Sequence, residues 1–268
     1  MGQVYPGGFL PHSAVACSDS VDLIVMVLSA PANHLKRQAI RDNWGRDVTN
    51  SPSARLLFLV GGANLTADQL TAIRVENHQT DVVFADFFDH YFNLTLKSVA
   101  MLDWVDLNCN SCRFLLKCDD DMYINVPALR EKLQTEPLAE KAVVGHLAHA
   151  WLPNRNAESK YFLSSQEFPF EVLPDFVTGP AYLVSGALVR PLLDAALEER
   201  WITLEDVFLT GVVAGARLGV PLTNWKEFSN ERAGVTPCNV RKFAIHEVRP
   251  AQQKTAMRAR NRICYSKR

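Results

Sequence analysis

Short, strongly apolar runs recur along the chain, and they constrain the fold more than any other feature. Residues 21–29 (VDLIVMVLS) and 55–60 (RLLFLV) are continuous and rich in β-branched or bulky aliphatic side chains, which is typical of strands buried on both faces. Residues 81–84 and 114–116 predict two more strands of this kind. Because helix-like stretches lie between these runs, the pattern predicts a mostly parallel sheet with helices on both faces.

The stretches between the runs place apolar residues at helical spacing. After the first strand, residues 33–44 put Leu35, Ala39 and Ile40 on one face, and Gly45 is expected to end that helix. The other helices are predicted at residues 67–78, 94–105, 126–133, 186–197 and 206–216, and the other strands at residues 142–147 and 178–183.

Length and composition bound the class of protein. With 268 residues and 48% hydrophobic composition, the chain can bury a sizeable core. Residues 1–20 are rich in Gly, Pro and Ser and are interpreted as a stem or leader, so a single domain is predicted over residues 21–268. A formal net charge of -1 argues against nucleic-acid binding. No apolar run approaches the roughly 18 residues of a membrane span, and the first residues lack the pattern of a signal peptide.

Three consecutive aspartates follow the strand at residues 114–116. Carboxylates as close as those of Asp119, Asp120 and Asp121 repel one another and raise each other's pKa unless a cation lies among them. Strand alternation puts Asp119 and Asp121 on one side and Asp120 on the other. Ligands bind at strand ends of this kind in open α/β sheets, so the triplet predicts a divalent metal site. The alternative is a solvated acidic turn that caps the following helix.

Other residues allow a functional and an ordinary interpretation. Arg37 and Arg41 lie four apart on a helix and could bind a phosphate or a carboxylate together, or form a solvated basic face. Asp206 follows Glu205 at a predicted helix start, where a carboxylate is either a cap or a general base. On its apolar strand, His246 is more typical of a core residue than of a metal ligand. The long loop at residues 150–176 favours a substrate wall or a cover for the core, built from the aromatic residues Trp151, Tyr161, Phe162, Phe168, Phe170 and Phe176.

Neither a GxGxxG nor a GxxxxGK[ST] loop occurs, which removes the main support for dinucleotide and P-loop sites. The six cysteines include a CxxC at Cys109 and Cys112, which is interpreted as structural because no second CxxC or His pair accompanies it. Two sequons, at Asn64 and Asn93, would permit N-glycosylation in the secretory route.

Several motifs, in order along residues 21–264, resemble the β-1,3-glycosyltransferases that use UDP-sugars, and most of all the β-1,3-galactosyltransferases. The motifs that carry this resemblance are RQAIRDNWG (37–45), DFFDHYFNLTLKS (86–98), KCDDDMYIN (117–125), KYFLSSQEFPF (160–170), TGPAYLVSG (178–186), LEDVFLTG (204–211) and the late His246.

The resemblance implies a GT-A fold, in which a Rossmann-type mixed sheet is flanked by helices. It implies an inverting transfer of galactose from UDP-galactose, in β-1,3 linkage, to a terminal sugar of a glycan acceptor. It also implies a Mn²⁺ requirement and a Golgi lumenal location, with a membrane anchor that this chain lacks. A β-1,3-N-acetylglucosaminyltransferase of the same family is the alternative.

The resemblance also assigns roles to individual residues. Asp121 would bind the metal ion, with Asp119, which faces the nucleotide sugar, and with His246, which reverses its interpretation as a core residue. Asp206 would be the catalytic base. The residues expected to bind the nucleotide sugar are Arg37, Arg41, Asp86, Lys97, Asp119, Asp120 and Glu205. Cys112 and Cys118 are predicted to be free thiols, because the resemblance covers Cys109, Cys238 and Cys264 more clearly.

Two departures from the family pattern leave the acceptor open: Gly179-Pro180-Ala181-Tyr182 replaces a Gly-rich turn, and Tyr161-Phe162 replaces a Trp-Tyr pair. Two further functions compete with the transferase. A phosphohydrolase with an aspartate nucleophile would want Thr or Val where Tyr123 stands, and a non-catalytic sugar-binding module would need broken site residues.

Overall fold

The structure, a computed structural model, describes residues 8–9, 17–18, 21–63, 65–76, 80–230 and 234–262. Its larger sheet has the order β3-β2-β1-β4-β7-β6-β8. The strands are β1 (Leu23–Leu28), β2 (Ala54–Gly61), β3 (Val82–Ala85), β4 (Phe114–Asp119), β6 (Val143–Ala148), β7 (Phe176–Ser185) and β8 (Leu222–Asn224). A smaller sheet, in the order β5-β10-β9, contains β5 (Tyr123–Ile124), β9 (Phe228–Ser229) and β10 (Ala244–Ile245).

The larger sheet is mixed, as predicted. Strand β1 pairs in parallel with β2 and β4, and β2 pairs in parallel with β3. Strand β7 runs antiparallel between β4 and β6, while β6 and β8 are parallel. The carboxyl ends of β1, β2, β3 and β4 therefore lie along one edge of the sheet.

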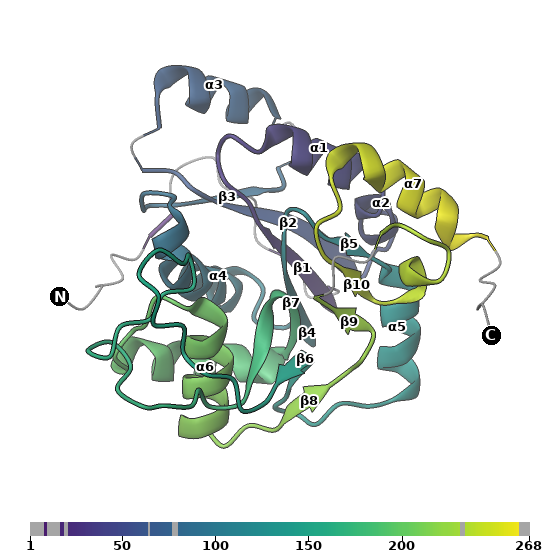
Figure 1. The fold of residues 1–268 in the computed structure, drawn as a ribbon. Helices are drawn as coiled ribbons and strands as arrows, with labels where there is room; N and C mark the ends of the chain where they lie inside the picture. The colour runs from purple at the N-terminus through teal and green to yellow at the C-terminus, as the bar shows by residue number, and fades with distance from the viewer. Residues whose placement is uncertain are drawn as a thin grey trace.

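Helices cover both faces of the larger sheet (Figure 1). They are α1 (His34–Asp42), α2 (Gly45–Thr49), α3 (Ala67–Glu76), α4 (Leu94–Asn108), α5 (Val126–Thr135), α6 (Gly186–Glu198) and α7 (Pro250–Arg260), with short 3-10 turns η2 (Tyr91–Asn93) and η4 (Asn239–Arg241) and a π-helix, η3 (Val207–Arg217).

Alternate residues of β1 belong to two separate hydrophobic clusters, as the strand period requires. Ile24 and Met26 pack in the cluster that includes α4, α6 and η3. Val25 and Val27 pack in the cluster that includes α1, α2, α5, α7 and the small sheet. The continuous apolar run at residues 21–29 thus reflects a strand buried on both faces.

Three local predictions differ from the structure. The helix predicted at residues 33–44 ends at Asp42, and Gly45 begins α2 instead of stopping the first helix. A Cβ at Gly45 would lie 2.7 Å from the Ile40 carbonyl oxygen, so close packing explains the glycine. The helix predicted at residues 206–216 has π geometry and begins at Val207. The strand predicted at residues 114–116 continues to Asp119.

The cysteines agree with the structural interpretation of the CxxC. Cys109 is bonded to Cys17 rather than to Cys112, which ties the N-terminal segment to the end of α4. Cys238 is also disulfide-bonded, and Cys112 and Cys118 are buried free thiols, which confirms the prediction for those two. Cys264 and the Asn64 sequon lie outside the described residues. None of the described helices has the length and hydropathy needed to cross a bilayer.

Candidate active site

The aspartate triplet begins at the carboxyl end of β4, where the loop after β1 lies next to it. Asp120 is the buried member of the triplet, and its carboxylate is fully engaged. It accepts hydrogen bonds from Ser29 Oγ at 2.7 Å, Asn33 Nδ2 at 2.8 Å and Lys36 Nζ at 2.7 Å. These contacts fix the loop between β1 and α1 to the triplet. The predicted contact of Asp120 with the nucleotide sugar stays a prediction.

Asp121 has different surroundings. Its Oδ1 atom is buried without a hydrogen-bond partner among the described residues, and it lies 3.7 Å from His246 Nε2. Burial and the charge of Asp119 raise the pKa of Asp121, while His246 and Lys36 act in the opposite direction. An orphaned carboxylate oxygen beside an imidazole nitrogen fits a site for a divalent cation.

The third predicted metal ligand does not join this pair. Asp119 Oδ1 accepts a hydrogen bond from Lys117 Nζ at 2.9 Å. In the part of the chain that the structure describes, no group of three or more His, Cys, Asp and Glu side chains is placed to hold a metal ion. The structure therefore brings Asp121 and His246 together, while the role of Asp119 as a ligand stays a prediction.

Asp206 lies immediately before η3, and its carboxylate is held by two backbone amides. Gly179 N–H donates to Oδ2 at 2.8 Å, and Val207 N–H donates to Oδ1 at 2.9 Å. Burial and the neighbouring charge of Glu205 raise the pKa of Asp206 to about 6, against the effect of both amides and of Lys117. A carboxylate poised in this range suits a general base at neutral pH.

Glu205 is buried beside Asp206 and contacts two side chains of the large sheet. Its Oε1 accepts from the Tyr182 hydroxyl at 2.6 Å, and its Oε2 lies 3.5 Å from Lys117 Nζ. Burial by itself would lower the pKa of Lys117, but the charges of Asp119 and Glu205 raise it, so the ammonium stays protonated. Glu205 thereby links Tyr182 and Lys117 next to Asp206.

The predicted basic residues are paired with acids of the chain itself. Arg37 binds Glu76 through two hydrogen bonds of 2.7 Å. Arg41 binds Asp81 at 2.8 and 2.9 Å and also contacts Glu76 at 2.7 Å. These pairs join α1 to α3 and to the residue that precedes β3. Of the predicted alternatives, the arginines thus bind carboxylates of the chain and do not form a solvated basic face, while their binding to the nucleotide sugar stays a prediction.

Lys97 is buried at the start of α4. Its ammonium donates to the Ser29 carbonyl at 2.7 Å and to Asp89 Oδ2 at 2.7 Å. Burial lowers the pKa of Lys97, although the charge of Asp89 opposes this. Through Ser29, Lys97 supports the same loop that holds Asp120. Asp86 has an exposed side chain just beyond β3.

The predicted aromatic wall divides into buried and exposed members. Phe168 and Phe176 belong to the core, whereas Trp151, Tyr161 and Phe170 are at least half exposed. Tyr91, which sequence reasoning did not single out, is also exposed and lies near the carboxylates. Partial burial raises the pKa of Tyr91 to about 12, with contributions from Tyr161, Asp206 and Asp119.

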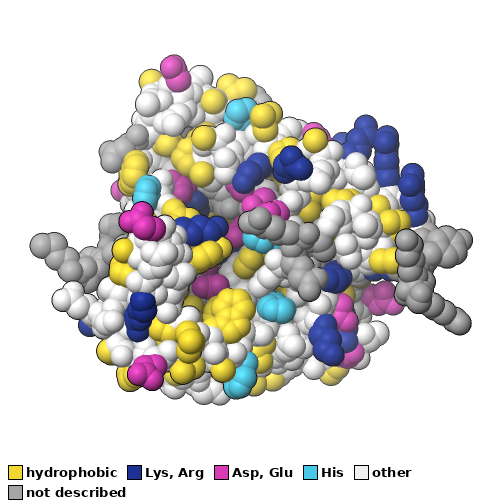
Figure 2. Space-filling model, in the orientation of Figure 1, with side chains coloured by type: hydrophobic (Ala, Val, Ile, Leu, Met, Phe, Trp, Pro, Cys, Tyr) yellow, Lys and Arg dark blue, Asp and Glu magenta, His cyan; other side chains and the backbone are white. Residues whose placement is uncertain are grey.

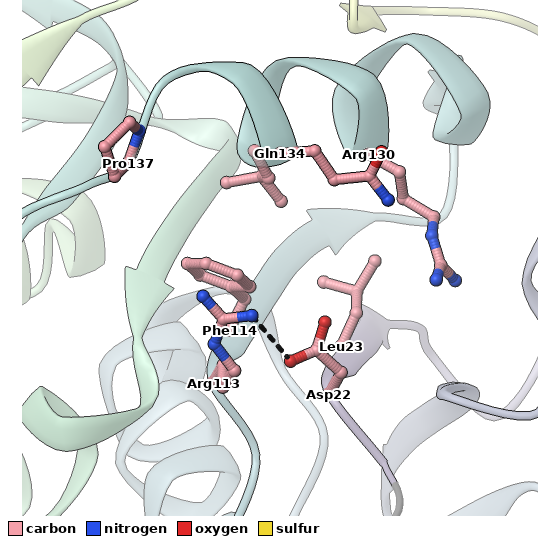
Figure 3. A pocket seen from close by; sticks show the side chains of 8 residues that line it. Asp22, Leu23, Arg113, Phe114, Arg130, Gln134 and Pro137 are labelled. Atoms are coloured by element: carbon pink, nitrogen blue, oxygen red, sulfur yellow. Dashed lines mark ion pairs between the residues drawn. The ribbon is translucent and has the colours of Figure 1, made fainter.

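Acidic, basic and histidine side chains gather around a hollow on the face shown in Figure 2. A separate pocket of about 300 Å³ lies at the opposite, amino end of β1 and β4 (Figure 3). Its lining includes Asp22, Arg113 and Arg130, and Asp22 pairs with Arg113 at 3.5 Å. None of the predicted site residues lines that pocket.

Sequence reasoning missed Lys117 and Gly179 as parts of the site. Lys117 is the only charged residue in the run from Phe114 to Cys118, and a charge inside a buried strand was a usable signal. Gly179 was noted only as part of a departure from the family pattern, because its contacts depend on the antiparallel pairing of β7 with β4.

The structure thus combines a mixed α/β sheet with an amide-bound carboxylate, Asp206, and a carboxylate–imidazole pair, Asp121 and His246. The galactosyltransferase family model matches residues 35–226 of this chain. The chain belongs to the galactosyltransferase family.

Individual relatives agree with this assignment. Beta-1,3-galactosyltransferase 5 of Pan paniscus is 31% identical over 205 residues, which cover 76% of this chain and 68% of that protein. UDP-GlcNAc:betaGal beta-1,3-N-acetylglucosaminyltransferase 7 of Rattus norvegicus is 29% identical over 88% of this chain and 63% of its own length. This chain thus spans about two thirds of the curated relatives. Among solved structures, galactosyltransferase LgtC in complex with donor and acceptor sugar analogues overlaps 89% of this chain and 92% of its own, with a TM-score of 0.42 and 13% identity.

Proposed function

We propose that the chain is an inverting β-1,3-galactosyltransferase that moves galactose from UDP-galactose to a terminal sugar of a glycan such as GlcNAc. The observation that carries this proposal is the environment of Asp206: two backbone amides hold its carboxylate, and burial raises its pKa to about 6. The family assignment supports glycosyl transfer as the reaction class.

In the proposed reaction, Asp206 takes the proton of the acceptor hydroxyl while that oxygen attacks the anomeric carbon of the donor sugar. The bond between the acceptor oxygen and the anomeric carbon forms, and the bond between that carbon and the diphosphate breaks. The electron pair of the broken bond leaves with UDP. A single attack from the opposite side inverts the anomeric configuration.

Asp121 and His246 are the residues that would hold a divalent cation, for which we propose Mn²⁺. When bound, the ion would supply Lewis-acid charge to the diphosphate. Asp119, Asp86 and Lys97 are proposed to line the donor site. Arg37, Arg41, Asp120 and Glu205 are proposed to support it, with their charged groups paired to other residues of the chain, as those of Lys97 and Asp119 also are.

The proposed setting is the lumenal side of the Golgi membrane. The proposal is tested by UDP release from a panel of UDP-sugars, with and without a β-linked GlcNAc acceptor. Acceptor-dependent UDP release from UDP-galactose is the expected result. UDP release that ignores the acceptor, or phosphate release from simple phosphoesters, would reject the transferase in favour of a hydrolase.

A second donor is favoured by one observation. The N-acetylglucosaminyltransferase relative is 29% identical to this chain and the galactosyltransferase relative 31%, so overall identity hardly separates them. UDP-GlcNAc is therefore the alternative donor in the same assay, and the same residues would serve it.

A further inference from the structure

One buried cation connects three segments of the candidate site. Lys117 lies within β4 with 2% of its side chain exposed. Its ammonium is 2.9 Å from Asp119 Oδ1 and 3.5 Å from Glu205 Oε2, and it donates to the Gly179 carbonyl at 2.5 Å. These partners belong to the end of β4, to the residues just before η3 and to the middle of β7.

Gly179 connects this cation to Asp206. Its carbonyl oxygen accepts from Lys117, and its N–H donates to Asp206 Oδ2 at 2.8 Å. A Cβ at this position would lie 3.2 Å from the same carboxylate oxygen, so the carboxylate rests directly against the backbone. A shift of the Gly179 backbone would therefore move one of the two amide donors that hold Asp206.

Burying an ammonium group costs several kcal/mol in desolvation, and an apolar side chain of the same length would avoid that cost. The residues before Lys117 in the strand, Phe114, Leu115 and Leu116, are all apolar and buried. Glu205 also has a second partner in the Tyr182 hydroxyl. The charge at position 117 is therefore better explained by what it positions than by stability alone.

We propose that Lys117 is a positioning residue for the transfer reaction, because it holds Gly179, and through Gly179 the carboxylate of Asp206, in a fixed place relative to Asp119. This inference rests on the proposed role of Asp206 as the general base. Lys117 acts through Gly179 and takes no proton in the reaction.

The first test is K117M, which removes the charge and keeps the chain length. We expect kcat to fall about 10- to 10²-fold, the scale of a small misplacement of a catalytic group. KM for UDP-galactose should change less than kcat does, because the donor would keep Asp121 and His246 even where the loss of Lys117 releases Asp119. The control is K132M, which removes a lysine of α5 that pairs with Glu136 on the surface. Wild-type kcat in K117M would overturn the inference.

A second comparison separates position from charge balance. The double variant K117M/E205Q loses one positive and one negative charge, so positions 117 and 205 no longer bury an unpaired charge. It is therefore expected to fold even if K117M alone does not. Its kcat is compared with that of E205Q. The same loss as between K117M and wild type is expected, because the Gly179 contact is absent in both. Recovery of the E205Q rate would show that Lys117 is only a counter-ion, and the inference would be wrong.

A readout without turnover keeps this test independent of the proposed function. Hydrogen–deuterium exchange should accelerate in K117M for peptides covering residues 177–183 and 204–208, while β1 and β2 keep wild-type protection. If the wild type transfers no sugar at all but exchange changes in this way, the proposed function fails and the contact stands. Unchanged exchange around Gly179, in an active enzyme, refutes the positioning role.

Discussion

Asp121 Oδ1 lies 3.7 Å from His246 Nε2, and this carboxylate oxygen is buried without a hydrogen-bond partner among the described residues. A carboxylate oxygen and an imidazole nitrogen, both atom types that bind Mn²⁺, thus lie close together, and the charge of Asp119 lies near the Asp121 carboxylate. Lys36 and Lys117 pair with Asp120 and Asp119, so Asp121 is the member of the triplet whose charge the proposed cation would balance.

Replacing Asp121 by Ala should abolish metal-dependent turnover. A cation that contributes about 3 kcal/mol to stabilising the leaving diphosphate corresponds to about 10²-fold in kcat. The measurements are a Mn²⁺ titration of the rate and calorimetric binding of Mn²⁺ with UDP. D194N, an exposed aspartate on α6, is the control and should behave as wild type. Full turnover in excess EDTA would reject the metal requirement.

Activity should fall as the pH drops through about 6. Asp206 must be deprotonated to act as a base, and burial raises its pKa to about 6, so kcat/KM should be flat above that pH and decline about tenfold per unit below it. D206N should lower kcat by about 10²-fold or more and remove this acidic limb, while UDP-sugar binding is kept. If D206N instead turns over normally and only melts at a lower temperature, Asp206 is a helix cap.

R37M should act on stability and not on donor binding. Arg37 is fully buried and binds Glu76, so its removal leaves an acid partly unpaired. Unfolding free energy should fall by about 3 kcal/mol, at the lower end for a broken buried pair because Arg41 still contacts Glu76. R46M, which breaks an exposed pair on the surface, should cost less than about 1 kcal/mol. Denaturant unfolding measures the free energy of both variants. A well-folded R37M with a tenfold higher KM for UDP-galactose would contradict this prediction and support direct binding of a donor phosphate by Arg37.

Much of the fold followed from the sequence, because buried strands leave a strong apolar signal. The runs at residues 21–29 and 55–60 became β1 and β2 with small changes of boundary. The π geometry of η3 left no mark in the spacing of its apolar residues. Nor did the sequence predict that Glu76 would pair with Arg37 and Asp81 with Arg41, since such pairings depend on how the chain packs around α1.

Site chemistry was predictable only in part. Asp121 and His246 are 125 positions apart, a separation at which spacing predicts nothing, and only the family motifs linked them. Strand alternation places Lys117 and Asp119 on the same face of β4, as their hydrogen bond shows, but it does not predict that Glu205 and Gly179 meet the same ammonium group.

Thiol counting on the denatured, unreduced protein should find two free cysteines, Cys112 and Cys118. The disulfide between Cys17 and Cys109 spans 92 residues, and a disulfide typically contributes about 2–4 kcal/mol of stabilisation. C17S should therefore lower the unfolding free energy by about 2–4 kcal/mol. C112S should lower it by less than C17S does, because no disulfide is lost. Six reactive thiols before reduction would contradict folding in an oxidising compartment.

Donor choice should favour UDP-galactose. Galactose and glucose differ in the configuration of one hydroxyl, and the acetamido group of GlcNAc adds bulk, so a few contacts decide between donors. Gly179 is fixed between Lys117 and Asp206, and the rigid ring of Pro180 follows it on β7. If the donor sugar lies against this part of β7, the fixed backbone cannot move away to make room for a bulkier donor.

The deciding measurement is kcat/KM for UDP-galactose and UDP-GlcNAc with one common acceptor. A preference of about tenfold or more for UDP-galactose is expected, which corresponds to about 1.4 kcal/mol. P180A should narrow that preference, because it removes the rigid ring from β7 and keeps the Gly179 contacts. A tenfold preference for UDP-GlcNAc would reverse the donor assignment and leave the transferase proposal in place, because Asp206 and the Asp121–His246 pair would serve either sugar.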